Sequence, residues 1–128
     1  MSRGLADTSV FIARESGRRL READLPDELA ISVITLGELR SGVLAAVDVE
    51  TRDRRLATLS EALAMDPLPV DQPVADAWAL LRVLLRDTGK RMPVNDSWIA
   101  ATAMSLGVPV VTQDEDYVEV VGLEVIRV

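Results

Sequence analysis

Short apolar runs of β type alternate along this chain with longer segments of helical periodicity, and this alternation restricts the possible folds most strongly. Helices that connect successive strands place those strands parallel, in a sheet covered on both faces. The predicted strands are Leu5–Ala6, Leu29–Ile34, Val108–Thr112 and Leu123–Val128, with an extended connection at Pro67–Val70. The predicted helices are Val10–Glu15, Thr35–Ala46, Val49–Met65, Pro73–Lys90 and Asn95–Leu106. The fold class is therefore α/β, with a central, mainly parallel sheet.

The sequence predicts one uninterrupted domain. At about 150 residues per domain, its 128 residues predict a single domain spanning 1–128. No stretch approaches the roughly 18 apolar residues of a membrane span, and Asp7 interrupts the apolar run near the N-terminus, so no signal peptide is expected. Together with the absence of cysteine, this predicts a soluble cytoplasmic protein.

The chain contains neither histidine nor cysteine. This excludes Ser-His-Asp and Cys-His catalysis, zinc sites built from imidazole or thiolate, and disulfides. Catalysis would then depend on carboxylates, hydroxyls, Lys, Arg or a bound cofactor. The 21 acidic and 14 basic residues give a net charge of −7, which disfavours broad contact with nucleic acid but permits a local one. Hard metal ions bound through oxygen fit this composition.

Several acidic residues follow the ends of predicted strands. In open α/β sheets, ligands bind outside the carboxyl ends of the strands, so acids in these places can converge at one edge of the sheet. They come from four segments of the chain: Asp7 after the first strand, Glu38 one turn into the helix after the second, Asp96 at the start of the helix near Asn95, and Asp114 and Asp116 after Thr112.

Each of these acids also has a local structural explanation. Asp7 or Ser9 can cap a helix, and Asn95-Asp96 can do the same. Thr35-Leu-Gly-Glu38 matches a capping box in which Glu38 would accept from the Thr35 amide, and Asp114-Glu-Asp116 fits a solvated turn. Burying four or five carboxylates together, however, costs many kcal/mol unless cations neutralise them. If the acids meet, they require a divalent metal.

Four segments, taken in order, resemble the PIN-domain ribonucleases, and among these the VapC toxins of bacterial toxin–antitoxin pairs. The resemblance covers essentially the whole chain, including Val121-Gly122-Leu123 before the last strand. It implies a three-layer α/β/α sandwich. The segments are Asp7-Thr8-Ser9, Thr35-Leu-Gly-Glu38-Leu39, Asn95-Asp96-Ser97-Trp98-Ile99-Ala100-Ala101 and Thr112-Gln-Asp114-Glu-Asp116-Tyr117.

The resemblance also implies the roles of individual residues. The catalytic acids at the metal site would be Asp7, Glu38, Asp96 and Asp114, with Asp116 as an accessory acid whose role varies within the family. Thr8, Ser9, Asn95 and Thr112 would orient the acids through hydrogen bonds, although capping and strand-end bonding explain these residues equally well.

The chemistry implied is hydrolysis of a phosphodiester bond in RNA. Bound metal lowers the pKa of water from ~15.7 towards neutrality and so supplies the nucleophile that this chain cannot generate with histidine. Carboxylate ligands favour Mg²⁺ or Mn²⁺. Four acids contribute −4 and two such ions +4, so a phosphate would approach a nearly neutral site. The sequence leaves open whether one or two ions bind.

All but one of the 14 basic residues are arginine, which suits bidentate contact with phosphate. Arg40 and Arg91 lie near the predicted acids and are the predicted RNA contacts. Arg82, Arg86 and Lys90 form a stripe on one helix that a solvated face explains better. Few aromatic residues are available for base stacking, and the two tryptophans are expected in the core. RNA specificity should therefore depend on the shape of a folded RNA, such as tRNA or rRNA.

The resemblance implies a cognate VapB-like antitoxin that blocks the acidic site, a homodimer, and a hetero-oligomer of toxin and antitoxin. The residues support this only loosely, because an apolar set that could form a partner groove is explained equally well by core burial. The set is Leu20, Leu25, Val43, Leu44 and Val47.

Three alternative functions share features with this one. A phosphoacceptor receiver domain would need paired acids after the first strand, a central strand-end Asp and a late Lys, but Asp7 has no acidic neighbour, Asp53 lies mid-helix and Lys90 is the only lysine. An inert PIN-like binding module would usually lack one of the four acids. A housekeeping RNA-processing nuclease of the same fold is barely distinguishable from a toxin by sequence, although the small size favours a toxin.

Overall fold

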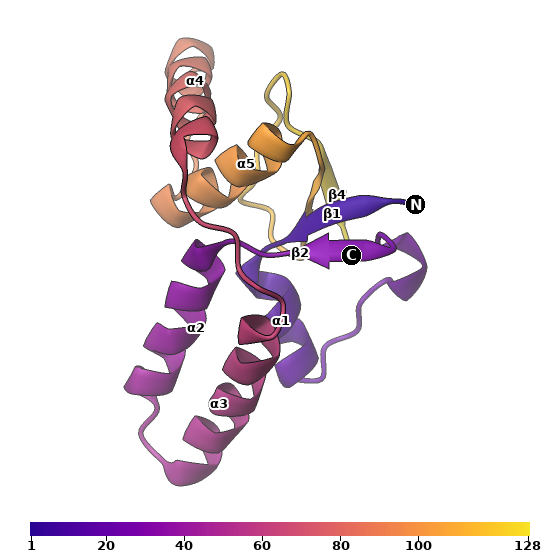
Figure 1. Ribbon diagram of the computed structural model, residues 1–128, viewed down its shortest axis with the longest axis vertical. Coiled ribbons are helices and arrows are strands. Elements are labelled where there is room, and N and C mark those ends of the chain that lie inside the picture. The colour runs from indigo at the N-terminus through magenta and orange to yellow at the C-terminus, as the bar shows by residue number, and fades with distance from the viewer.

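The computed structural model describes residues 1–128 as a four-stranded sheet between two helical layers (Figure 1). All strand pairs are parallel, and the strand order is β2-β1-β3-β4. The predicted α/β class is confirmed. The strands are β1 (Arg3–Ala6), β2 (Glu28–Ala30), β3 (Val110–Thr112) and β4 (Val125–Arg127). The helices are α1 (Thr8–Glu15), α2 (Val33–Ala45), α3 (Val49–Leu63), α4 (Gln72–Thr88) and α5 (Val94–Leu106), with a short 3₁₀ turn, η1 (Glu22–Asp24).

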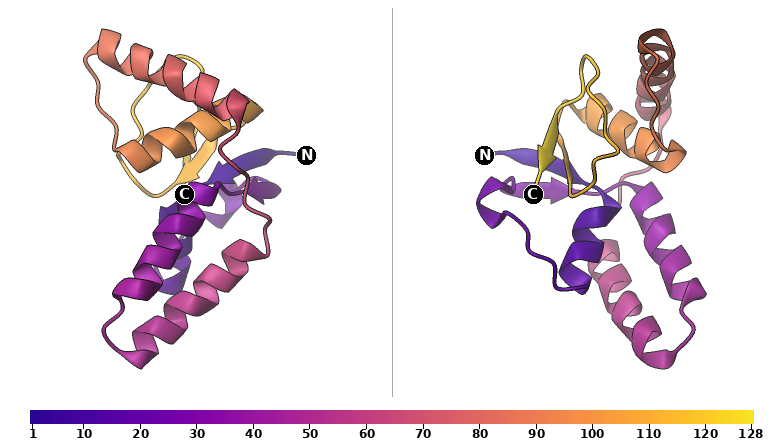
Figure 2. Two further views of the ribbon diagram at one scale, coloured as in Figure 1. Left: turned by 60° about the vertical axis from the view of Figure 1, so that its left-hand side comes forward. Right: turned by 180° about the vertical axis from the view of Figure 1, so that it is seen from behind.

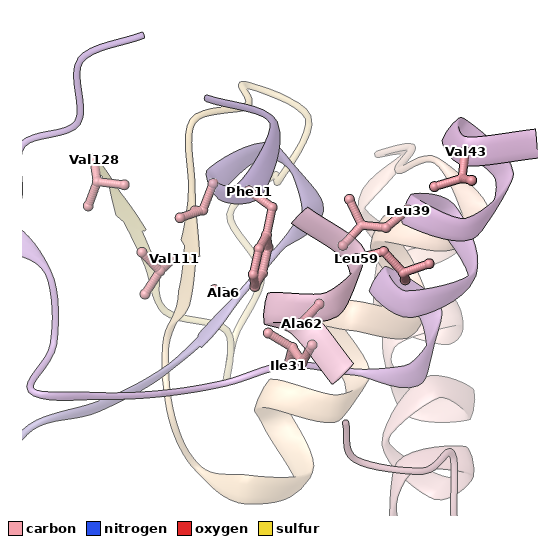
Figure 3. Close-up of a cluster of buried hydrophobic side chains, with 10 residues drawn as sticks. Ala6, Phe11, Ile31, Leu39, Val43, Leu59, Ala62, Val111 and Val128 are labelled. Carbon is pink, nitrogen blue, oxygen red and sulfur yellow. The ribbon is translucent and has the colours of Figure 1, made fainter. Parts of the chain in front are cut away.

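Helices α4 and α5 cover one face of the sheet, and α1, α2 and α3 cover the other (Figures 1 and 2). Adjacent strand residues point to opposite faces, as the two-residue period of a strand requires. Leu5 and Val110 belong to the core beneath α4 and α5, whereas Ala6 and Val111 belong to the core beneath α1 to α3 (Figure 3). The sheet is therefore buried on both sides, as the apolar strand sequences predict.

The order of the strands fixes where a ligand can bind. The chain runs from central β1 to β2 on one side, and later returns to β3 on the other side of β1. Neighbouring strands whose connections leave in opposite directions form a crevice at their carboxyl ends, which is the usual ligand site of an open parallel sheet. Here the crevice lies between the ends of β1 and β3, next to the starts of α1 and α5.

One predicted element is wrong in its second half. The apolar run Leu29–Ile34 was expected to be a strand, but β2 ends at Ala30 and α2 already begins at Val33. Ser32 ends the extended segment, because its hydroxyl oxygen accepts the Ile34 amide at 3.0 Å and caps α2. A short apolar run does not by its periodicity distinguish a strand from the start of a buried helix.

None of the helices combines the length and the apolar character that a membrane-spanning helix needs.

Candidate metal centre

Asp7 lies at the base of the crevice and is almost completely buried. It is the N-cap of α1: its Oδ1 accepts from the Ser9 amide at 3.0 Å and from the Ser9 hydroxyl at 2.5 Å. The Thr112 hydroxyl at the end of β3 donates to Oδ2 at 2.7 Å. The capping role and a site role therefore coexist in the same side chain, because each carboxylate oxygen has more than one lone pair.

The same hydroxyls extend the network into the loop after β3. Ser9 Oγ accepts from the Gln113 amide at 2.8 Å, and Thr112 Oγ1 accepts from the Asp114 amide at 2.9 Å. Two side chains thus connect the ends of neighbouring strands and fix the backbone that carries Asp114. This is the arrangement by which outer residues orient metal-binding carboxylates.

Three carboxylates from separate parts of the chain converge here. One oxygen each from Asp7, Asp96 and Asp114 lies within 4.8 Å of the others. Asp7 follows β1, Asp96 lies in the first turn of α5, and Asp114 follows β3. Asp96 does not cap α5, because the N-cap residue is Pro93 and no side chain caps this helix. The capping alternative for Asn95-Asp96 is therefore wrong.

Glu38 reaches the site from α2. The Thr8 hydroxyl donates to its Oε1 at 2.6 Å and lies 3.2 Å from the Thr35 hydroxyl. Thr35 is buried inside α2 rather than at its start, so the capping box proposed for Thr35 and Glu38 does not form. Glu38 is instead held towards α1 across the crevice, although it is outside the group of three converging carboxylates.

An open groove of about 400 Å³ leads to these carboxylates, and Glu38, Asp96, Asp114 and Asp116 line it. Asp116 is exposed on the loop after β3. Asn95 is exposed at the rim. Its side chain makes no hydrogen bond to an acid. A second hollow of about 420 Å³ shares Glu38 and Asn95, so the open surface continues along α2.

Burial and neighbouring negative charges raise the pKa values of Asp7, Asp96 and Asp114. Burial raises the pKa of Asp96 to about 7, and the negative charges of Asp7, Asp114, Asp116 and Glu38 add to this. Burial also raises the pKa of Asp7, against the hydrogen bonds from Ser9 and Thr112, and that of Asp114, against the charge of Arg18. Clusters of like charge with raised pKa values are typical of functional sites.

Tyr117, to which the sequence assigned no role, also faces this cluster. Its ring packs with the core beneath α4 and α5, and its buried hydroxyl has no hydrogen-bond partner. Burial and the negative charges of Asp7 and Asp96 raise its pKa well above the ordinary range. Its position directly after Asp116 was the only sequence signal for it.

A divalent cation fits this set of donors. Carboxylate oxygens are the ligands that Mg²⁺ and Mn²⁺ prefer, and oxygens on opposite sides of Mg²⁺ are roughly 4 Å apart, close to the span of the three carboxylates. A cation would also favour the ionised form of Asp96, whose charge the metal-free crevice opposes. The buried Tyr117 hydroxyl, which has no hydrogen-bond partner, lies close enough to Asp7 and Asp96 for their charges to raise its pKa.

The two predicted RNA contacts lie in different places. Arg91 lies in the connection between α4 and α5 and lines a separate hollow beside the groove. Arg40 is exposed on α2, two residues beyond Glu38, and lines neither hollow of the acidic groove.

Comparison with known proteins identifies the family. The family model for the PIN domain matches residues 5–123. Ribonuclease VapC5 of Mycobacterium tuberculosis is 52% identical over 128 residues, covering 98% of this chain and 95% of that protein. Ribonuclease VapC4 of the same organism is 48% identical over 126 residues, covering 98% and 97%.

A crystal structure agrees with these matches. The structure of VapBC-5 from Mycobacterium tuberculosis, described as a member of the VapBC family of toxin-antitoxin systems, contains a chain that superposes with a TM-score of 0.92. Sequence identity to it is 47%, with 100% of both chains covered. The fold, the acidic crevice and these matches agree, and the chain belongs to the PIN-domain family and, within it, to the VapC proteins.

Proposed function

We propose that this chain is a metal-dependent endoribonuclease, the toxin of a toxin–antitoxin pair, and that it acts in the cytoplasm. The observation that carries the proposal is the convergence of Asp7, Asp96 and Asp114 at the crevice of the sheet, in a chain without histidine or cysteine. The names of the relatives as ribonucleases support the reaction class, and the VapBC complex supports the toxin role.

Bound Mg²⁺ or Mn²⁺ would supply an activated water and neutralise charge on the phosphate. The residues of the chain hold and orient the site. Asp7, Asp96 and Asp114 are the proposed ligands, Glu38 completes the acidic set from α2, and Asp116 is an accessory acid at the edge of the groove.

Hydroxyl groups set the positions of these acids. Ser9 and Thr112 fix Asp7, and Thr112 also fixes the backbone of Asp114. Thr8 positions Glu38. For Asn95 we propose contact with substrate or water at the rim of the groove, where its side chain is exposed.

The proposed substrate is a structured RNA such as tRNA or rRNA. The groove is open and lined by acids, and it offers no aromatic side chain on which bases could stack. Recognition would then depend on the shape of a folded RNA and on positive charge beside the groove. Arg91 and Arg40 are the proposed contacts from the α4–α5 connection and from α2.

The proposed partners are a VapB-like antitoxin and a second copy of the chain. The superposed VapBC-5 complex supports an antitoxin of this type. The apolar residues predicted for a partner groove divide into two groups. Val43 is buried in the core and Leu20 and Leu25 pack against that core, whereas Leu44 and Val47 are 76% and 96% exposed. Exposed apolar side chains at the end of α2 give a partner a surface to cover.

Asp96→Asn tests the catalytic proposal. The variant keeps the size of the side chain and removes the charge, so we expect loss of Mg²⁺-dependent RNA cleavage, by about 10²-fold or more, with the fold retained. The matched control is Asp53→Asn, which removes one exposed carboxylate from α3, far from the groove, and should cleave like the unmodified chain. Cleavage that persists in EDTA, or in Asp96→Asn, would contradict the proposal.

Expression in a bacterial host separates the toxin from a housekeeping nuclease. A toxin should arrest growth, and co-expression of its antitoxin should relieve the arrest. Harmless expression of a chain that cleaves RNA in vitro would favour the housekeeping nuclease instead.

A further inference from the structure

A third hollow, of about 280 Å³, lies between α4 and the connection to α5, and it is basic rather than acidic. Arg82, Arg86, Lys90 and Arg91 line it, together with Leu85, Met92 and Ser97. We call it the basic pocket. At about 30 Å³ per water molecule, its volume admits a phosphate group with part of its hydration shell. No carboxylate lines it, although the chain as a whole carries a charge of −7.

Two residues that line the basic pocket, Arg82 and Ser97, contact Trp78 of a stacked tryptophan pair. Trp78 of α4 stacks on Trp98 of α5, with ring centroids 4.2 Å apart and planes 2° from parallel, so the tryptophans are a half-buried pair and not the core residues that the sequence predicted. Arg82 lies over Trp78, 5.0 Å from the ring centroid. This contact holds the guanidinium group in place beside the pocket.

The other basic side chains that line the pocket differ in their interaction partners. Lys90 donates to the carbonyl of Glu119 and so connects the pocket to the loop before β4. Arg86 pairs only with its exposed neighbour Asp87, an interaction of little energetic value. Arg91 makes no ion pair. Arg86 and Arg91 therefore have guanidinium groups available to an anion.

The basic pocket borders the acidic groove. Met92 lines the pocket and the next residue, Pro93, lines the groove. Likewise Asp96 lines the groove and Ser97 lines the pocket, because consecutive helical residues project about 100° apart. A chain of phosphates that places one phosphate at the carboxylates can therefore reach the pocket by crossing the first turn of α5.

We propose that the basic pocket binds a backbone phosphate of the RNA substrate, on one side of the bond that is cleaved. The inference depends on the proposed function and adds to it a binding subsite for the substrate. Arginine matches phosphate geometry through bidentate hydrogen bonds, and cations near an acidic centre offset its repulsion of a polyanion. In this proposal the stripe on α4, which the sequence assigns to a solvated face, is part of the substrate-binding surface.

The experiment compares two pairs of substitutions in full-length protein carrying Asp96→Asn, which keeps the RNA intact. Arg86→Gln with Arg91→Gln removes the two available guanidinium groups, whereas Arg14→Gln with Arg52→Gln removes the same charge from α1 and α3, outside the pocket. Binding of a fluorescein-labelled RNA hairpin is followed by anisotropy in Mg²⁺ between about 50 and 200 mM salt. A gel after each titration checks that the RNA is intact.

Each phosphate contact contributes about 0.7 to 0.9 to the slope of log K against log salt. Loss of two contacts should lower that slope by about 1.5. If the ionic contribution to binding vanishes near 1 M salt, the same loss weakens binding about 15- to 30-fold at 0.15 M salt. The Arg14 and Arg52 pair should change binding less than about twofold, because screening limits distant charges. Arg86→Lys with Arg91→Lys keeps both charges and should restore most of the affinity.

Equal effects of the two glutamine pairs, or no effect of either, would overturn the inference. So would normal RNA binding combined with weaker binding of the antitoxin, because the pocket would then serve a protein. Circular dichroism and thermal melting show whether each variant folds. If the unmodified chain fails to cleave RNA in Mg²⁺ while the predicted binding difference is found, the proposed function fails and the phosphate site remains.

Discussion

Replacing Asp96 by asparagine should stabilise the metal-free protein, even though the same change should abolish cleavage. In the metal-free crevice the pKa of Asp96 is raised from 3.8 to about 7, so at pH 8 the fold holds a carboxylate in its unfavourable ionised form. Each pKa unit corresponds to about 1.36 kcal/mol, which gives about 4 kcal/mol for the full shift. Asp96 is only half-buried, and screening by water reduces this to about 1–2 kcal/mol.

The assay is thermal or urea unfolding in EDTA, followed by tryptophan fluorescence. For a domain of this size, 1–2 kcal/mol corresponds to an increase in Tm of about 4–8 °C at pH 8. The control is Asp53→Asn, which removes the same charge from an exposed position on α3 and should shift Tm by much less. With Mg²⁺ or Mn²⁺ the unmodified chain should become more stable than Asp96→Asn, because it binds the metal better and is stabilised more by it.

The pH dependence of stability is a second test of whether the ionised Asp96 destabilises the metal-free protein. A carboxyl whose pKa is higher in the folded than in the unfolded state binds more protons when folded, so its stabilising contribution is complete below pH 3.8 and is lost as the pH rises towards 7. The pKa values of Asp7 and Asp114 are raised as well, in the same direction. In EDTA the stability of the unmodified chain should therefore fall between about pH 4 and 7, and Asp96→Asn should flatten this fall. A less stable Asp96→Asn variant, or stability that rises over this range, would refute the reasoning.

Three further substitutions test the packing around the site by urea unfolding in EDTA. Thr112→Val removes a buried hydroxyl that donates to Asp7 at 2.7 Å and should cost about 1.5–3 kcal/mol, whereas Thr112→Ser should retain most of the stability; equal losses would contradict a role for the hydroxyl. Gly4→Ala would place a Cβ atom 2.8 Å from both Val111 Cγ2 and Pro26 Cγ and should cost about 1–3 kcal/mol, and an unchanged midpoint would show that these two side chains can move aside. Tyr117→Phe removes a buried hydroxyl without a partner and should leave stability unchanged or slightly higher, and a loss above about 1 kcal/mol would reveal a hydrogen bond that the structure lacks.

The edge of the sheet at which the acids lie could be predicted from the sequence. Asp7 and Asp114 closely follow short β-type runs, and Asp96 opens a helix whose C-terminal Gly107 is an αL cap. These are local signals, and parallel topology converts them into proximity without knowledge of any side-chain contact.

The bonds that hold the acids in place could not be predicted. The donation from Thr112 to Asp7 joins residues 105 positions apart, and that from Thr8 to Glu38 joins residues 30 apart. A hydroxyl next to an acid in the sequence can equally cap a helix or end a strand, so the sequence left both functions open. The start of α2 was misplaced for a similar reason, because Ser32 acts as a cap within an apolar run.

The Trp78–Trp98 pair shows a third limit. Both residues fall on the apolar stripes of their helices, and a stripe does not distinguish its centre from its edge. The crossing of α4 and α5 leaves the pair half-buried, where it supports Arg82 instead of filling the core. Helix periodicity determines which face of a helix is buried, and tertiary packing determines how deeply each side chain on that face is buried.

The acids of the crevice are stabilised unequally, and this inequality suggests how the site works. Asp7 is the most buried of the three converging carboxylates, and the hydrogen bonds from Ser9 and Thr112 offset part of the rise in its pKa that burial causes. Asp96 has no such donor, and its pKa rises to about 7. A proton or a cation can therefore neutralise the charge of Asp96, which no hydrogen bond compensates. Metal binding at pH 6.5 should therefore release about three quarters of a proton from Asp96, and calorimetry in buffers of different ionisation enthalpy would measure it. No proton release at pH 6.5 would mean that Asp96 is already ionised in the metal-free crevice.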